Sequence, residues 1–147
     1  MTSNQSDLMG VIFDMDGVLL DTEPVHVAAY EALFSPYDIT FSHETFREVA
    51  LGVPRRDVIL TMLGEDLPEE ELRELMARKA TLVEAILADS RLETLPGIPE
   101  LLDFLELRGV PVAVATSSKM PSTFLAAAGI EERFSVIVGG DDVENNK

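Results

Sequence analysis

Three short apolar runs, each ending in polar residues, constrain the fold of this 147-residue chain more than any other feature. The runs cover Leu8–Phe13, Val110–Ala115 and Phe134–Val138. They are rich in valine and isoleucine, and apolar and polar residues alternate only weakly, which is typical of strands buried on both faces. We therefore expect an α/β fold with a parallel sheet flanked by helices.

Segments between these runs have the pattern of helices. Glu100–Arg108 stops at Gly109, and Pro121–Ala128 stops at Gly129. Glycine is the residue that most often terminates a helix. The spacing between strand and helix suits right-handed crossovers between parallel strands.

A long helical stretch separates the first two runs. Apolar residues recur at helical spacing in four segments, which are Glu23–Phe34, His43–Leu51, Arg55–Leu63 and Pro68–Leu87. Ordinary crossovers between neighbouring strands are much shorter. We therefore expect residues 20–95 to form an α-helical cap inserted into an α/β core, which comprises residues 1–19 and 96–147.

The charge balance excludes several classes of function. Lysine and arginine number 11 against 27 acidic residues, for a net charge of −16, which disfavours binding to nucleic acid or to anionic membranes. The absence of cysteine excludes disulfides and thiolate chemistry. With no targeting signal and no apolar stretch of membrane-spanning length, we expect a cytoplasmic protein. We expect it to be a monomer.

Polar residues follow each apolar run. In open α/β sheets, ligands bind beyond the carboxyl ends of the strands, so these residues are the candidates for a site. They are Asp14 and Asp16 after the first run, Thr116, Ser117 and Ser118 after the second, and Asp141, Asp142 and Lys147 after the third.

Asp14-Met15-Asp16-Gly17 has two interpretations. Asp-Gly between apolar residues is a strong signal for a hairpin turn. However, Asp21-Thr22-Glu23-Pro24 follows as a helix entry, where a hairpin requires a returning strand. The alternative is a divalent-metal site, because a hard cation such as Mg²⁺ relieves the repulsion between two close carboxylates. The carboxylate that does not bind metal would then be available for acid–base chemistry.

The run DMDGVLLDTEP, residues 14–24, resembles the first motif of the haloacid dehalogenase superfamily, in the branch with an α-helical cap after the first strand. Ala115-Thr116-Ser117-Ser118 is similar to the second motif of that family, and residues 139–147 are similar to the approach to the third, a lysine. The resemblance covers nearly the whole chain and implies a Rossmann-like core that carries an inserted cap.

The resemblance also implies roles. Asp14 would be the nucleophile that forms an aspartyl-phosphate, and Asp16 would protonate the leaving alcohol and later activate water. Asp14 and Asp16 would hold Mg²⁺. Thr116 would bind a phosphoryl oxygen, and Lys147 would neutralise charge beside Asp14.

Residues of the cap complete the expected substrate site. His26, Arg55 and Lys79 fall where β-phosphoglucomutases and related sugar-phosphate phosphatases of the family carry substrate contacts. The alternatives are a surface or capping histidine for His26 and solvated charges for Arg55 and Lys79. Lys119 would either cap a helix or touch substrate. Thr22, Gly52 and Ser117 complete the set of expected substrate-binding residues.

One departure from the family pattern is clear. The fourth motif, an acidic pair after a further strand, is missing, and three strands fall below the usual sheet size, so we expect a fragment that lacks roughly a third of its parent. The predicted activity is a Mg²⁺-dependent phosphatase for a small phosphorylated metabolite, with a sugar phosphate as the expected substrate. A phosphomutase and an inactive remnant are the alternatives. A dehalogenase is disfavoured, because the resemblance implies that this branch needs no Mg²⁺ and keeps no acid at the position of Asp16.

Overall fold

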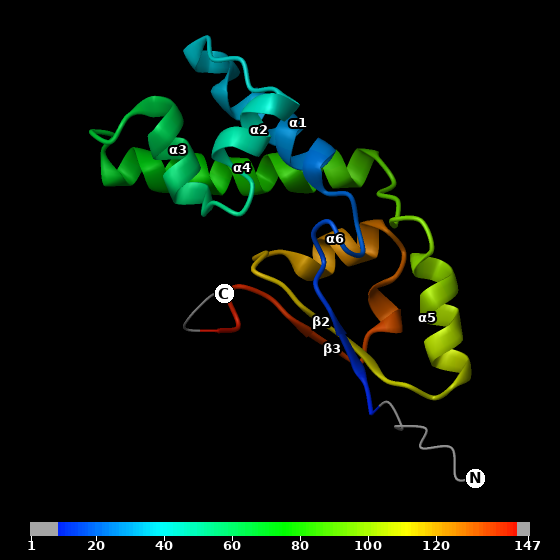
Figure 1. Cartoon of the computed structure of the whole chain (residues 1–147). Coiled ribbons are helices and arrows are strands. Elements are labelled where there is room, and N and C mark those ends of the chain that lie inside the picture. The colour runs from blue at the N-terminus through cyan, green and yellow to red at the C-terminus, as the bar shows by residue number, and fades with distance from the viewer. Residues whose placement is uncertain (1–8, 144–147) are drawn as a thin grey trace, which may run out of the picture. The chain divides into compact units, whose positions relative to one another are not determined.

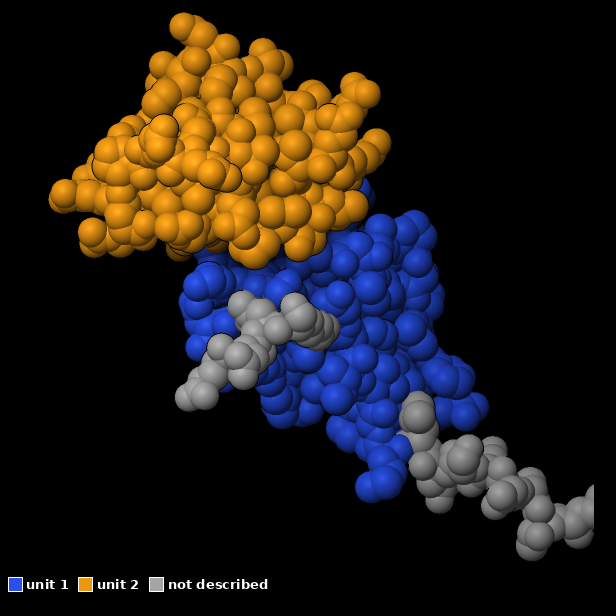
Figure 2. Space-filling view, turned by 60° about the vertical axis from the view of Figure 1, so that its left-hand side comes forward, with its two compact units in different colours: residues 1–21, 91–147 blue, residues 22–90 orange. Residues whose placement is uncertain are grey.

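The computed structural model describes residues 9–143, and Figure 1 shows the course of the chain through its helices and strands. The chain divides into two compact units, which Figure 2 distinguishes by colour. One contains residues 1–21 and 91–147, and the other contains residues 22–90. We call them the sheet unit and the helical unit.

The sheet unit contains three parallel strands, and the predicted α/β class is confirmed. They are β1 (Val11–Phe13), β2 (Val112–Ala115) and β3 (Val136–Val138), in the spatial order β1-β2-β3. Each strand is shorter than the apolar run that predicted it. Pro111, which has no N–H, stands just before β2 and accepts a hydrogen bond from the Val11 N–H at 3.0 Å through its carbonyl oxygen.

The expectation that these strands are buried on both faces is wrong for part of the sheet. Paired residues of parallel strands point to the same side, and the register places Ile12, Ala113 and Val136 in one row. In this row Ile12 is 73% exposed and Val136 is 53% exposed, whereas Phe13 and Val114 on the opposite face are buried. The described residues leave most of the side chain of Ile12 uncovered, so an apolar run does not guarantee two covered faces.

Helices also form part of the sheet unit within residues 9–143 (Figure 1). They are α5 (Ile98–Leu107) and α6 (Pro121–Ala127), and a short 3₁₀ helix, η2 (Glu131–Arg133), precedes β3. Both α5 and α6 lie where helices were predicted. Their buried side chains, Leu102, Leu105, Phe124 and Leu125, build the core of the unit, and the rings of Phe13 and Phe134 meet edge to face at 6.3 Å.

The helical unit consists of α1 (Glu23–Phe34), α2 (His43–Val49), α3 (Arg55–Leu63) and α4 (Glu69–Asp89), with a 3₁₀ turn, η1 (Ser35–Tyr37), after α1. All four helices were predicted, although α2 ends two residues earlier than expected. Helix α1 packs along α4 (Figure 1). The core contains the rings of Tyr30, Phe34 and Phe41, whose centroids lie 4.8–5.7 Å apart.

Candidate active site

The segment after β1 forms a compact turn. The carbonyl oxygen of Met15 accepts the N–H groups of Val18, Leu19 and Leu20 at 3.0–3.3 Å, and the Gly17 N–H donates to the Leu20 carbonyl at 2.9 Å. Gly17 has a φ of +71°, which glycine adopts without strain. The chain does not return as a strand paired with β1, because β1 pairs with β2 in parallel. The hairpin interpretation of residues 14–17 is therefore wrong.

This turn presents two carboxylates at the carboxyl end of β1. Met15 between them is fully buried, so the chain is anchored there, while Asp14 is exposed and Asp16 is half-buried. The Met15 N–H donates to Asp14 Oδ1 at 3.0 Å. The hydroxyl of Thr116, at the end of β2, donates to Asp16 Oδ2 at 3.3 Å. The structure thus brings Asp16 and Thr116 together, although 100 residues separate them in sequence.

The segments after β2 and β3 lie side by side in the same unit. The Thr116 N–H donates to the Val138 carbonyl at 3.0 Å, and Thr116 itself is buried. Lys119 Nζ forms an ion pair with Asp141 at 2.9 Å, and both side chains are more than half exposed. Ser117 is exposed at the carboxyl end of β2. Lys119 was expected to cap a helix or to touch substrate. In the structure its ammonium group pairs with the carboxylate of Asp141 in the β3 loop and does not cap a helix.

The donor set at this edge fits a hard cation. Asp14 and Asp16 supply carboxylate oxygens, and Mg²⁺ is commonly bound by one or two carboxylates together with waters and substrate phosphate oxygens. Among residues 9–143, no group of three or more histidine, aspartate or glutamate side chains is arranged to hold a metal ion. Asp14 and Asp16 are therefore a minimal oxygen-donor pair within this part of the chain.

The helical unit buries a second group of polar side chains. Lys79 of α4 is 3% exposed, and its Nζ donates to Nδ1 of His26 of α1 at 2.9 Å. Nζ also lies 4.3 Å from the centroid of the Tyr30 ring. The interpretation of Lys79 as a solvated charge is wrong, because the helix face that carries it packs against α1.

The pKa values in this group follow from burial and charge. The pKa of His26 is lowered to about 3, first by burial and then by the positive charges of Lys79 and Arg55. Burial raises the pKa of Tyr30 to about 12. A neutral His26 accepts from the Lys79 ammonium through Nδ1, which places its remaining ring proton on Nε2. We call Lys79, His26, Tyr30 and Arg55 the buried basic cluster.

Arg55 and the two remaining predicted residues of this unit have different settings. Arg55 is half-buried, and its Nη1 donates to the Met76 carbonyl at 2.9 Å, so it is not simply a solvated charge. Thr22 is buried at the start of α1, and its carbonyl accepts the His26 N–H at 3.1 Å. Gly52 is exposed in the turn between α2 and α3, with a φ of +72°.

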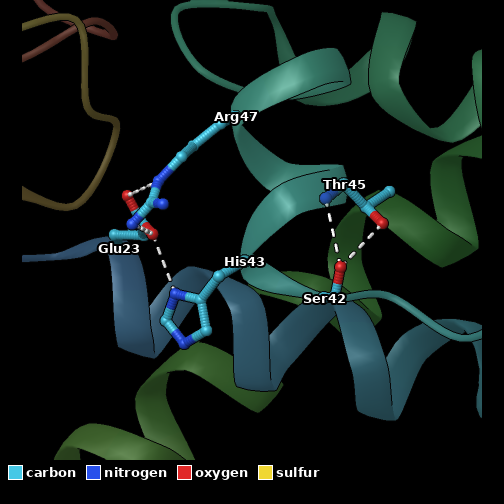
Figure 3. Close-up of polar contacts among 5 residues, drawn as sticks. All are labelled: Glu23, Ser42, His43, Thr45 and Arg47. Carbon is cyan, nitrogen blue, oxygen red and sulfur yellow. Dashed lines mark hydrogen bonds and ion pairs between the residues drawn. The ribbon is translucent and has the colours of Figure 1, made fainter.

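An ion-pair group at the start of α1 was not expected from the sequence. Glu23 accepts from His43 Nδ1 at 2.8 Å and pairs with Arg47 at 2.8 Å, as Figure 3 shows. The hydrogen bonds from His43 and then Arg47 lower the pKa of Glu23. His43 thus ties α2 to α1. His43 and Arg47 follow Glu23 by 20 and 24 residues, so no local sequence pattern predicts these contacts.

A shallow groove of the helical unit contains none of the predicted site residues. It runs beside α4 and is lined by Tyr37, Glu71 and Arg78 among others.

None of the helices described within residues 9–143 has the length and apolar character needed to cross a membrane. Lys147, the predicted charge-neutralising lysine, lies outside the described residues.

Comparison with known proteins supports one family. The family model for haloacid dehalogenase-like hydrolases matches residues 11–147. A phosphorylated carbohydrates phosphatase of Thermotoga maritima is 33% identical over 139 residues, which cover 93% of this chain and 63% of that protein. The crystal structure of CbbY from Rhodobacter sphaeroides in complex with phosphate superposes with a TM-score of 0.79 at 26% identity, over 95% of this chain and 67% of that one.

A more distant structure shares the fold. The β-phosphoglucomutase of Clostridium difficile gives a TM-score of 0.77 at 24% identity, over 95% of this chain and 65% of that one. The chain thus spans just under two thirds of the length of the Thermotoga maritima phosphatase and a similar share of both structures. On the family-model match, the resemblance drawn from the three motifs is confirmed, and the chain belongs to the haloacid dehalogenase-like hydrolases.

Proposed function

We propose that the protein is a phosphatase that acts on a small phosphorylated metabolite, with a phosphorylated carbohydrate as its substrate. The observation that carries the proposal is the edge of the sheet where Asp14, Asp16 and Thr116 stand together. There an exposed carboxylate, a second carboxylate and a hydroxyl occupy the carboxyl ends of adjacent parallel strands. This is the edge at which open α/β sheets bind their ligands.

In the proposed reaction, a carboxylate oxygen of Asp14 attacks phosphorus while the bond from phosphorus to the alcohol oxygen of the substrate breaks. Asp16 gives its proton to that departing oxygen. In the second half, Asp16 takes a proton from a water molecule, whose oxygen attacks phosphorus and releases Asp14. Exposure of Asp14 suits the attacking group, and contact with Thr116 orients Asp16.

The phosphoryl group needs compensation of its negative charge in a chain of net charge −16. We propose that Asp14 and Asp16 hold Mg²⁺, which would supply positive charge to the phosphoryl oxygens when bound. Thr116 contributes a hydroxyl donor and Ser117 a further one. Lys147 remains the proposed lysine beside Asp14. Lys119 is held by an exposed ion pair, which is weak enough to exchange Asp141 for an anionic ligand.

The helical unit is proposed to act as the cap that sets substrate choice. Its buried basic cluster gathers Lys79, His26 and Arg55, and Thr22 and Gly52 flank the first and third helices. The positive charges of Lys79 and Arg55 suit an anionic ligand in a strongly acidic protein, and the neutral ring of His26 suits a hydroxyl group. The Thermotoga maritima relative is named for phosphorylated carbohydrates, and CbbY was solved with phosphate, which supports a sugar phosphate as the substrate.

The test is turnover of a panel of sugar phosphates by the protein and by its Asp14→Asn variant, with Mg²⁺ present and after chelation. We expect phosphate release by the unsubstituted protein, its loss on chelation, and loss of at least about 1,000-fold in the variant. Asp103→Asn is the matched control, because it changes an exposed aspartate of α5 in the same unit. Retained turnover in Asp14→Asn contradicts the nucleophile assignment, and no release from any substrate contradicts the proposed function.

The same assay separates the alternatives. Supplied with glucose 1-phosphate and a bisphosphate primer, a phosphomutase yields glucose 6-phosphate, whereas a phosphatase yields free phosphate. An inactive remnant yields neither product and binds Mg²⁺ weakly, since it offers two acids at the site.

A further inference from the structure

The loop after β3 is tied to the loop after β2 by a series of short hydrogen bonds. Asp142 Oδ2 accepts the Gly139 N–H at 2.7 Å, and the Asp142 N–H donates back to the Gly139 carbonyl at 3.1 Å. These two bonds close residues 139–142 into a ring. The adjacent Gly140 N–H then donates to the Ser118 carbonyl at 2.7 Å.

The series continues from Ser118 to the candidate active site. The Ser118 N–H donates to Thr116 Oγ1 at 3.1 Å. A hydroxyl has one proton to donate, and here the Ser118 N–H occupies a lone pair of that oxygen. The proton of Thr116 Oγ1 is thereby left to point toward Asp16 Oδ2, 3.3 Å away. Ser118 therefore sets the direction in which Thr116 donates.

From this series we propose that Asp142 is a positioning residue for Thr116. It acts by holding the 139–142 ring, through which Gly140 fixes Ser118 and Ser118 fixes the Thr116 hydroxyl. The inference rests on the proposed function only for its effect on turnover. The role of the ring in placing Ser118 and Thr116 is independent of what the site does.

Gly139 offers a second, independent test of the contact between the 139–142 ring and Ser118. A Cβ added at Gly139 would lie 2.9 Å from Pro121 Cγ, which is closer than real Cβ atoms come, and 3.0 Å from the Ser118 carbonyl oxygen, which is tighter than most real contacts. Pro121 of α6 and the Ser118 carbonyl therefore leave little room for a side chain at this position. We expect Gly139→Ala to displace the β3 loop from Pro121 and Ser118 without removing the Asp142 carboxylate.

The experiment compares Asp142→Ala, Asp142→Asn and Gly139→Ala with the unsubstituted protein and with Asp103→Ala. Asp103→Ala is the matched control, because it removes an exposed carboxylate of the same unit whose partner is Arg133. Asparagine keeps an oxygen that can accept the Gly139 N–H, so Asp142→Asn should behave as a rescue. It also covers the case in which Asp142→Ala does not fold.

The first readout is amide chemical shift and hydrogen exchange by NMR, without substrate. In Asp142→Ala and Gly139→Ala we expect the Gly140 and Ser118 amides to shift and to exchange at least about fivefold faster, while Asp142→Asn and Asp103→Ala leave them unchanged. Changes confined to residues 139–142 would mean that Asp142 shapes only its own turn, and would overturn the proposal.

The second readout is the split between kcat and KM with a sugar phosphate. We expect Asp142→Ala to lower kcat about five- to tenfold with KM changed less than about twofold, because Thr116 is misdirected rather than lost. Normal kcat in a variant with displaced Ser118 and Thr116 amides overturns the link to turnover. If no variant and no unsubstituted protein turns over substrate, the proposed function fails, while the NMR result still decides whether Asp142 positions Thr116.

Discussion

Lys79 and His26 place their side-chain nitrogens 2.9 Å apart inside the helical unit, with the lysine 3% exposed. The pKa of His26 is lowered to about 3 by burial, with the charges of Lys79 and Arg55 acting in the same direction, against 6.5 for an ordinary histidine. Between these two values the unfolded chain binds a proton that the folded protein does not. The stabilisation linked to His26 is therefore fully present above about pH 6.5. The free energy of unfolding falls as the pH is lowered from there toward 3.

The substitution His26→Gln tests this pH dependence, because glutamine can still accept from Lys79 but does not titrate. Measured by urea unfolding, the free energy of unfolding of the unsubstituted protein should lose about 2 kcal/mol more than that of His26→Gln between pH 7 and pH 5. Thr81→Val, at an exposed residue of α4 that does not titrate, is the control and should keep the full slope. Equal slopes for the unsubstituted protein and His26→Gln would show that His26 is not held neutral.

Tyr30 gives a spectroscopic test of the same buried cluster. Its pKa is raised to about 12 by burial, and the chain contains two tyrosines and no tryptophan. In Tyr37→Phe, phenolate absorbance should therefore appear with a midpoint near pH 12, while circular dichroism reports whether the fold persists. Because the unfolded chain loses the tyrosine proton first, stability falls as the pH rises from 10 toward 12. A midpoint near 10 in folded protein contradicts the burial of this ring.

Thr116→Val tests the hydrogen bond from Thr116, at the end of β2, to the carboxylate of Asp16. Valine keeps the shape of threonine but leaves Asp16 and the Ser118 N–H without the hydroxyl. We expect turnover to fall about 10- to 100-fold and the free energy of unfolding to fall by about 1 kcal/mol. Thr81→Val is the control, since Thr81 donates to the Ala77 carbonyl on the exposed side of α4. Equal effects of the two substitutions on turnover would remove Thr116 from the site.

Ile12 and Phe13 test the asymmetry of the sheet. Ile12→Ala should change the free energy of unfolding by less than about 0.5 kcal/mol, because the side chain is 73% exposed. Phe13→Ala should cost about 3 kcal/mol or more, because the ring is buried against Phe134. Both are measured by denaturant unfolding. A cost for Ile12→Ala near that of Phe13→Ala would mean that this face of the sheet is covered in solution.

The order of the elements could be predicted from sequence because it depends on local patterns. The helices Glu23–Phe34 and Arg55–Leu63 have the predicted bounds, since the first has a proline in its first turn, the second follows a proline, and the apolar spacing is helical. The positions of Asp14, Asp16 and Thr116 follow from the rule that the ends of parallel strands meet at one edge. The exposure of Ile12 could not be predicted, because composition does not say what covers a face.

Contacts between distant segments were the other limit. The buried state of Lys79 depends on the packing of α4 against α1, and the Glu23–His43 contact depends on how α2 returns to α1. Asp142 was noted as a polar residue after a strand, but its bond to Gly139 and the approach to Ser118 need coordinates. Tertiary packing decides such contacts, and one sequence carries no periodic signal for them.

The central claim is that Asp14 carries the phosphoryl group during turnover. The most direct measurement is to mix the protein with a phosphorylated carbohydrate and Mg²⁺, to reduce the quenched sample with borohydride, and to map the peptides by mass spectrometry. Reduction converts an aspartyl-phosphate to homoserine, so the account predicts homoserine at position 14, and none there in a sample without substrate. Homoserine at another carboxylate, or its absence from position 14 while phosphate is being released, would contradict the account.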